Sequence, residues 1–409
     1  MSTASENPRV TTTLISIARA RELVLQHTTP LGHELVDIEK ALDRVLADEV
    51  RAAGDVPPFP CSAMDGYAIK AGPAGRTLQL VGESRAGTPA DRELADGEAI
   101  RISTGAAVPP GAIAVIRQED TESDGDTVTV TKDAEPGDNV RDAGEDMRQG
   151  ASVLAAGTTL RAAELGAAVA AGVGDVLVSR KPRVQVLSTG DELRAPGEPL
   201  RPGEIHNSNA PMLVALATRC GAAPAPAQRL RDDRDATEQA LATALEQSDV
   251  TVVSGGVSVG PHDHVKPALA ALGVSEVFWG VSLQPGKPTW FGTAGDKLVF
   301  GLPGNPVSAF VTFSLFVRPA LIALQNATDP PQLDTEAVLA TAVRRNRSRE
   351  QAIRVRLERL DGTTIALPTG PQASHIVTSL LGADALALIP AGEGDAPAGT
   401  RVQLQPLAN

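Results

Sequence analysis

Three short segments of the sequence combine glycine with hydroxyl, carboxylate or amide side chains, and each follows a short apolar run. They are residues 188–192 (STGDE), 254–260 (SGGVSVG) and 301–306 (GLPGNP). Glycine has no Cβ, so backbone N–H groups in such turns can approach a phosphate closely, and hydroxyl groups add further donors. The second turn has neither the Lys-Ser/Thr ending of a P-loop nor the G-x-G-x-x-G spacing of a dinucleotide fold, so neither class is predicted.

The third turn predicts where a helix begins. Asn305 is a preferred N-cap residue, and Pro306 suits the first helical position, where its missing N–H leaves no donor unsatisfied. The free N–H groups and the positive end of the helix dipole would favour an oxyanion. A well-capped structural helix without a ligand explains the same residues, so this turn alone leaves both interpretations open.

Carboxylates near these turns indicate a metal that prefers oxygen ligands. The run Pro261-His262-Asp263-His264 places Asp263 just past the second turn, where it could hold a divalent cation against phosphates. The two histidines lack a third ligand at a zinc-like spacing, so Mg²⁺ is favoured over Zn²⁺. Each of these carboxylates could instead be a solvated surface residue. The carboxylates considered are Asp65, Asp146, Asp191, Glu192, Asp232 and Asp263.

One lysine stands in a stiff turn. Lys287 lies within Gln284-Pro285-Gly286-Lys287-Pro288, an unusual place for a merely solubilising charge. We therefore consider it a candidate contact for an anion.

The elements that would position the turns have the rhythm of a parallel sheet. Apolar runs at 184–187, 250–253 and 298–300 precede the turns, and helical patterns lie between them, which predicts βαβ connections over residues 182–328. Ligands of such sheets bind beyond the carboxyl ends of the strands. We therefore expect the three turns to line one pocket.

The N-terminal third of the chain predicts two domains, one inserted in the other. Apolar residues at helical spacing over 14–25 and 35–46, and an Ala-rich pattern over 151–178, predict a helical domain made of residues 10–55 and 147–181. Residues 56–146 are rich in glycine, proline and β-branched runs, and include an Asp124-Gly125 turn. They predict an inserted β-rich domain.

The C-terminal residues 329–409 predict a small β domain. Alternating runs at 353–360 and 363–367 flank Asp361-Gly362, a dipeptide typical of hairpin turns. A β-barrel or a β-sandwich fits this pattern.

Composition excludes several classes of protein. A net charge of -13 and the lack of a basic patch interleaved with aromatics argue against nucleic acid binding. Cys61 and Cys220 show no metal or redox spacing, and no secretion signal is visible, so a cytoplasmic protein is expected. Residues 306–324 are apolar, but Arg318 and Pro319 interrupt them, which favours a buried core helix over a membrane span.

Taken together, the motifs resemble the molybdopterin molybdenumtransferase family, the MoeA and gephyrin E-domain class. The similarity extends over nearly the whole chain. The segments that carry it are residues 58–68 (PFPCSAMDGYA), 103–106 (STGA), 139–141 (NVR), 144–146 (GED), 188–193 (STGDEL), 254–260 (SGGVSVG), 285–288 (PGKP) and 302–308 (LPGNPVS).

The resemblance implies an elongated four-domain protomer with a three-layer α/β molybdopterin-binding domain, an inserted β-rich domain and a C-terminal barrel-like domain. It implies a homodimer whose cleft lies between subunits, where domain two of one chain faces domain three of the other. The implied reaction takes adenylylated molybdopterin and molybdate, cleaves the pyrophosphate with Mg²⁺ and releases AMP. Molybdopterin adenylyltransferase and recipient molybdoenzymes are implied partners.

The resemblance also implies roles for particular residues. It places Asp65, Thr104, Asp146, Glu192 and Asp263 in catalysis, and three of them, Asp65, Glu192 and Asp263, at the metal. Molybdate would lie near Lys287, Ser308, Arg349 and Ser374, whose donors form charge-assisted hydrogen bonds. The other implied ligand-binding residues are Gly190, Asp232, Ser254, Gly255, Gly256, Ser258, Pro303, Asn305 and Pro306.

The sequence departs from the family pattern at four positions. Pro60 and Cys61 stand where the family usually has Asp and Asn, and Gly280 and Gln284 stand where basic residues are common. The loss of positive charge keeps two alternatives in view: a catalytically weak paralogue that binds the pterin nucleotide, and a scaffold protein.

Overall fold

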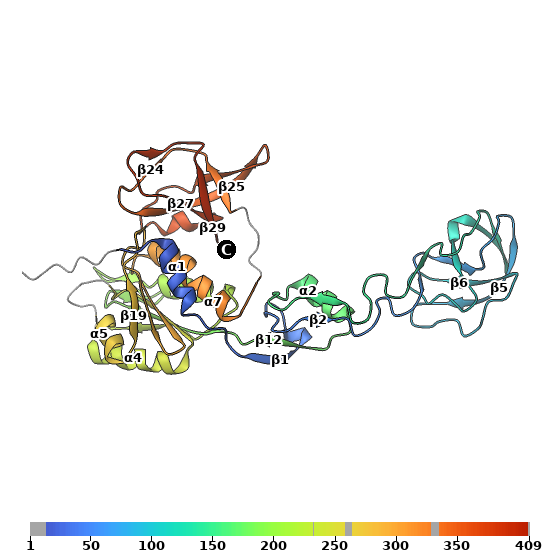
Figure 1. The fold of residues 1–409 in the computed structure, drawn as a ribbon, viewed down its shortest axis with the longest axis horizontal. Coiled ribbons are helices and arrows are strands. Elements are labelled where there is room, and N and C mark those ends of the chain that lie inside the picture. The colour runs from blue at the N-terminus through green and yellow to red at the C-terminus, as the bar shows by residue number, and fades with distance from the viewer. Residues whose placement is uncertain (1–13, 232, 258–263, 329–334, 408–409) are drawn as a thin grey trace, which may run out of the picture. The chain divides into compact units, whose positions relative to one another are not determined.

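The computed structural model describes residues 14–231, 233–257, 264–328 and 335–407 (Figure 1). The chain forms two compact units. One is Leu35–Val178, and the other joins Met1–Glu34 to Ser179–Asn409. Each unit has its own hydrophobic clusters.

A mixed sheet forms the centre of the larger unit. Its parallel strands are β13 (Arg183–Thr189), β18 (Val250–Ser254) and β22 (Lys297–Leu302), with the short β16 (Ala223–Pro224) and β17 (Gln228–Leu230) beside β13. The strands β21 (Trp290–Ala294) and β19 (Ser275–Trp279) continue it antiparallel. The predicted parallel strands are thus confirmed, and each leads into one of the glycine-bearing turns.

Two hydrophobic clusters cover the opposite faces of this sheet, because successive side chains of a strand point to opposite sides. Val252 belongs to one cluster and Val253 to the other. The Val252 face packs against α1 (Ile17–Gln26), α3 (Asn209–Arg219), α6 (Pro306–Thr312) and α7 (Arg318–Leu324). The Val253 face packs against α4 (Arg234–Gln247) and α5 (Val265–Ala271). The result is the expected three-layer α/β arrangement.

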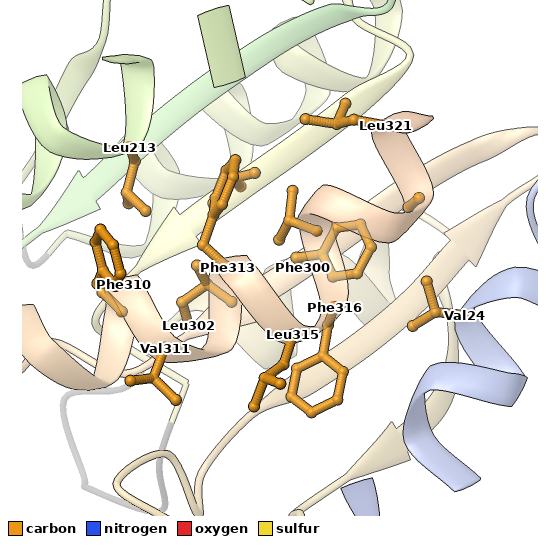
Figure 2. Packing of buried hydrophobic residues seen from close by; sticks show 14 of the residues in the cluster. Val24, Leu213, Phe300, Leu302, Phe310, Val311, Phe313, Leu315, Phe316 and Leu321 are labelled. Atoms are coloured by element: carbon orange, nitrogen blue, oxygen red, sulfur yellow. The ribbon is translucent and has the colours of Figure 1, made fainter. Parts of the chain in front are cut away.

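The apolar segment at Pro306–Leu324 lies in this core. It forms α6, a π-helical turn (Phe313–Val317) and α7, and Figure 2 shows Phe313 and Phe316 of the turn near Phe300 of β22. The segment is long and apolar enough to span a membrane, but 78% of its apolar window is buried inside the protein. The prediction of a core helix is confirmed.

A closed barrel forms the C-terminal part of the larger unit. Its strands follow the order β25 (Glu350–Leu360), β26 (Thr363–Pro368), β23 (Glu336–Leu339), β29 (Arg401–Pro406) and β27 (Ala385–Ile389), and β27 pairs again with β25. Asp361 and Gly362 have φ angles of 49° and 77°, which a two-residue type I′ hairpin turn requires. Of the two predicted alternatives, the barrel is correct.

Short elements complete the larger unit. They are β14 (Leu193–Arg194), β15 (Ile205–His206), β20 (Leu283–Gln284), β24 (Val343–Arg344), β28 (Asp395–Ala396) and a 3-10 turn at Val377–Leu380. The strand β20 pairs with β25, which fastens the turn containing Lys287 to the barrel.

The smaller unit contains a six-stranded sheet, as the β-rich pattern of residues 56–146 predicts. Its order is β7 (Ala114–Arg117), β4 (Gly66–Ile69), β6 (Glu98–Ile102), β5 (Thr77–Ser84), β9 (Thr127–Val130) and β8 (Thr121–Asp124). The hairpin of β8 and β9 turns at Gly125, with φ of 58°. A 3-10 turn at Gln118–Asp120 and the short pair β3 (Cys61–Ser62) and β10 (Val140–Arg141) accompany it.

The helical prediction for residues 35–46 is wrong. This segment contains the end of β1 (His33–Asp37), which pairs with β12 (Asp175–Ser179), and a 3-10 turn at Ile38–Lys40. The Asp37 carboxylate accepts a hydrogen bond from the Glu39 N–H at 2.8 Å, which begins the turn. Asp43 then has φ of 59°, outside the range of a right-handed helix.

The helical prediction for residues 151–178 is also too broad. Only α2 (Ala162–Ala170) is helical, between β11 (Ser152–Leu154) and β12, and β11 pairs with β2 (Val50–Arg51). The predicted helix at residues 14–25 does form as α1, but Ile17, Ala20 and Val24 pack in the core of the larger unit. The region expected to be a helical domain is therefore mostly short strands around one helix.

Candidate substrate site

The carboxyl ends of β13, β18 and β22 meet at one cavity of about 670 Å³. Each glycine-bearing turn contributes to its wall, so the prediction of a shared pocket is confirmed for the described residues. The lining residues are Ser188, Thr189, Glu192, Leu193, Ile205, His206, Asn207, Ser208, Asn209, Ser254, Gly304, Asn305, Pro306, His375 and Val377.

The glycines of the second turn are required by contact with the first turn. A Cβ on Gly255 would lie 2.8 Å from the Thr189 Oγ1, and one on Gly256 would lie 2.9 Å from the same atom and 2.8 Å from the Val265 Cγ2 at the start of α5. Both glycines have positive φ, of 89° and 65°. Since any other residue would be both strained and crowded, these glycines allow the two turns to pack closely.

Gly190 makes room for the carboxylate of Glu192. Its φ is 143°, and a Cβ there would lie 2.4 Å from the Glu192 Oε2. The Glu192 side chain therefore folds back over the first turn, and Glu192 lines the cavity.

Asn209, which the sequence analysis did not single out, connects the second and third turns. Its Nδ2 donates to the Ser254 Oγ at 2.8 Å and to the Gly304 carbonyl at 2.7 Å. Asn209 is 8% exposed, and its Oδ1 is buried without a hydrogen-bond partner among the described residues, as is the Ser188 Oγ. The only signal in the sequence is the polar run Asn207-Ser208-Asn209 ahead of a helical pattern.

A helix does begin at Pro306, as predicted, but Asn305 does not cap it with its side chain. The Asn305 Nδ2 instead donates to the Ser374 Oγ at 3.2 Å, and the Val307 N–H donates to the Ser374 carbonyl at 3.2 Å. The Ser374 carbonyl thus accepts from the Val307 N–H, which is one of the donors at the helix start that we expected to be free for an oxyanion. Pro303 and Ser308 are buried beside this turn.

Lys287 and Arg349 lie in neighbouring segments, although neither lines the cavity described above. The Asn346 Nδ2 donates to the Gln284 Oε1 at 2.5 Å, and the Asn346 Oδ1 accepts from the Arg349 N–H at 2.9 Å. Gln284, which departs from the family pattern, therefore joins the two segments. On the other side, a Cβ on Gly286 would lie 2.6 Å from the Thr312 Cγ2, one helical turn after Ser308.

Gly280, another departure from the family pattern, faces the N-terminal segment. Its φ is 91°, and a Cβ there would lie 2.8 Å from the Leu14 Cδ2. A basic side chain at this position would require Leu14 to move.

In the smaller unit, Asp65 and Thr104 are directly bonded. The Asp65 Oδ1 accepts from the Thr104 N–H at 2.7 Å and from the Thr104 hydroxyl at 3.1 Å. Both residues are exposed, and so is Asp146, whose backbone N–H donates to the Val56 carbonyl at 2.9 Å. Thr104 therefore orients one oxygen of a carboxylate that faces solvent.

The implied metal ligands do not form a cluster in the part of the chain that the structure describes. No group of three or more His, Cys, Asp or Glu side chains able to hold a metal occurs among those residues. Asp65 belongs to the smaller unit and Glu192 to the larger one. Asp263, together with Asp232 and Ser258, lies outside the described residues.

Three family models match successive parts of the chain. The MoeA N-terminal region (domains I and II) matches residues 15–172, the probable molybdopterin binding domain matches residues 185–323, and the MoeA C-terminal region (domain IV) matches residues 336–407. The cavity at the three turns therefore lies mainly in the region of the molybdopterin-binding model.

Several molybdopterin molybdenumtransferases and related structures are similar to this chain over most of their length. A molybdopterin molybdenumtransferase of Bacillus subtilis is 34% identical over 91% of this chain and 89% of its own. Molybdopterin molybdenumtransferase 2 of Mycobacterium tuberculosis is 37% identical over 90% of this chain and 94% of its own. The crystal structure of the MoeA protein of Pyrococcus horikoshii matches with a TM-score of 0.80 and 31% identity, covering 97% of this chain and 100% of the other. This chain belongs to the molybdopterin molybdenumtransferase family.

Proposed function

We propose that this protein inserts molybdate into adenylylated molybdopterin and releases AMP in a Mg²⁺-dependent step. The observation that carries the proposal is the meeting of three glycine-bearing turns at one cavity within the region of the molybdopterin-binding model. Backbone N–H groups of such turns, with the hydroxyls of Thr189 and Ser208, suit a phosphorylated and polar ligand. Membership of the family supports the same reaction.

Mg²⁺ fits the carboxylates that are described. In proteins this ion keeps several waters and is held by one or two carboxylates together with substrate phosphates. A compact cluster of protein ligands is therefore not required, and Asp65 and Glu192 are the candidate carboxylates among the described residues. A bound Mg²⁺ would neutralise charge on the phosphate oxygens as the pyrophosphate link breaks.

The chain's own residues would orient the reacting groups. Thr104 holds one oxygen of the Asp65 carboxylate with two hydrogen bonds, which leaves the other oxygen for a ligand. Lys287 and Arg349, in segments joined through Asn346 and Gln284, would supply positive charge for molybdate, which is a substrate and a dianion.

We further propose that the protein acts as a homodimer in the cytoplasm. Both cysteines are free thiols, which suits a reducing compartment. Molybdopterin adenylyltransferase would supply the substrate, and molybdoenzymes would receive the product. Light scattering of the purified chain would test the dimer, and a monomer at all working concentrations would contradict it.

The decisive experiment measures AMP release. Purified protein is incubated with adenylylated molybdopterin, Mg²⁺ and molybdate, with matched samples that lack molybdate or contain a chelator of Mg²⁺. Release of AMP and appearance of molybdenum on the pterin support the proposal. Absence of AMP release in the complete mixture would contradict the proposal and favour the alternative of a weak paralogue that binds the pterin nucleotide without turnover. The positive charge lost at Gly280 and Gln284 is the observation that motivates this alternative.

A further inference from the structure

Arg354 is a buried cation in the C-terminal barrel. It belongs to β25, and its side chain is 0% exposed. Burial lowers the pKa of its guanidinium to about 10, so the side chain still carries its charge at neutral pH. No ion pair joins it to a carboxylate in the described part of the chain, and its Nη1 is buried there without a hydrogen-bond partner.

A buried charge without a counter-ion calls for an explanation other than stability. Taking an ion out of water is unfavourable, and an apolar side chain of similar volume is often neutral or stabilising in its place. The barrel itself closes through backbone pairing, since β25 pairs with both β26 and β27. The Arg354 side chain must therefore serve a contact that strand pairing does not provide.

The Arg354 guanidinium contacts one irregular segment, residues 371–379. Its Nε and Nη2 both donate to the Ser379 Oγ, at 3.2 and 3.0 Å. The Nη2 also donates more weakly to the Pro371 and Ala373 carbonyls, at 3.4 and 3.5 Å. Because this segment pairs with no strand, a single side chain holds both of its ends against the barrel.

The same segment forms part of the wall of the cavity at the three glycine-bearing turns. His375 and Val377 line that cavity. Ser374 accepts a hydrogen bond from Asn305 of the third turn, at 3.2 Å. Arg354 does not line the cavity itself, so it can influence a ligand there only through the segment that it holds.

We propose that Arg354 is a positioning residue for substrate binding, which keeps residues 371–379 ordered as a wall of this cavity. The inference rests on the proposed function in one respect, namely that the pterin substrate binds in the cavity. A wall that is already ordered does not have to lose conformational freedom when the ligand binds. Loss of the guanidinium should therefore weaken binding without changing the chemical step.

The test compares Arg354→Met with Arg356→Met. Methionine is apolar and flexible, so it fills much of the space of Arg354 without its charge or its donors. Arg356 is the matched control, because it is an exposed arginine of the same strand that pairs with Glu358. We expect KM for adenylylated molybdopterin to rise about tenfold in Arg354→Met and kcat to stay within about twofold, whereas Arg356→Met should match the wild type.

Ser379→Ala reaches the same contact from the other side. It removes the hydroxyl that accepts two of the guanidinium hydrogen bonds but leaves the cation in place. KM should rise in this variant too, and the double variant should be no worse than Arg354→Met, because both changes break one contact. Amide hydrogen exchange should become faster in residues 371–379 and stay slow in β25 and β27.

Binding of molybdopterin, measured by calorimetry, separates this inference from the proposed function. Weaker binding to Arg354→Met and Ser379→Ala than to Arg356→Met supports the inference even in a protein that releases no AMP, in which case only the proposed reaction fails. Equal binding to all three variants would overturn the inference even if the wild type turns over.

Two further results would also overturn it. A fall in kcat with unchanged KM would place Arg354 in the chemical step, and a wild type that binds no molybdopterin would remove the cavity from substrate binding. If Arg354→Met does not fold, Ser379→Ala decides between the same outcomes, because it keeps the buried cation.

Discussion

The Asn209 side-chain amide donates to the Ser254 hydroxyl at 2.8 Å, and so ties the start of α3 to the end of β18. The same Nδ2 reaches the Gly304 carbonyl at 2.7 Å. One buried amide thus sets the spacing of two turns that line the candidate site.

Asn209→Ala should lower the free energy of unfolding by about 1–3 kcal/mol, because the buried Ser254 hydroxyl and the part-buried Gly304 carbonyl lose their donor. It should also weaken substrate binding, since the two turns are no longer held together. Denaturant unfolding of the variant measures the first effect. Gln247→Ala, at an exposed amide side chain near the end of α4, is the control, and equal stability of the two variants would contradict this role for Asn209.

Asp65→Asn should slow AMP release by about a hundredfold, because the amide still accepts from Thr104 but no longer carries the negative charge with which Asp65 would hold the proposed Mg²⁺ against the substrate phosphates. Its fold and oligomeric state should not change, because Asp65 is exposed. Asp124→Asn, at the exposed hairpin of the same unit, should have the activity of the wild type. Unchanged turnover in Asp65→Asn would remove this carboxylate from the mechanism.

Gly190→Ala should impair activity by displacing a neighbouring carboxylate. The new Cβ would meet the Glu192 carboxylate, so Glu192 would leave its present position. A shift of this kind can reduce turnover by about a hundredfold. The backbone strain should cost about 1–3 kcal/mol of stability.

Gly197→Ala is the control that separates the effect of backbone strain from the effect of displacing the Glu192 carboxylate. Gly197 also has positive φ, of 83°, but a Cβ there meets nothing within 4 Å. Turnover of both variants is compared at a temperature where circular dichroism shows each to be folded. Equal activities would mean that the position of the Glu192 carboxylate is unimportant.

Asp249 should contribute stability that is lost in acid. Burial opposes ionisation of this carboxyl, but hydrogen bonds from Arg183 and the charges of Arg180 and Arg183 outweigh it, so its pKa is lowered in the folded protein. A lowered folded pKa gives stability that is present above the ordinary pKa of about 4 and is lost as the pH falls below it.

The variant Asp249→Asn should therefore be less stable than the wild type at pH 7. The difference in melting temperature should shrink as the pH is lowered through 4 toward the folded pKa. A difference that stays constant between pH 7 and pH 3 would show that the loss is one of packing and not of charge.

Features that depend on neighbouring residues were readable from the sequence. The Asp361-Gly362 turn demands positive φ at two positions, and the start of α6 follows from proline at the first helical position. The parallel strands were readable because their short apolar runs end in glycine-bearing turns. Ligands of a parallel sheet bind beyond the carboxyl ends of its strands, so the same pattern also predicted that the three turns line one cavity.

Only the tertiary structure decided features that join distant parts of the chain. Residues 35–46 have helical spacing, but residues 35–37 pair with β12 as the end of β1, and a 3-10 turn follows at Ile38–Lys40. The Asn305 amide bonds to Ser374, 69 residues away, instead of capping its own helix. Asn209 bonds to partners 45 and 95 residues away. Local patterns cannot anticipate such bonds, because a polar side chain takes whichever partner the folded chain brings within 3 Å or so.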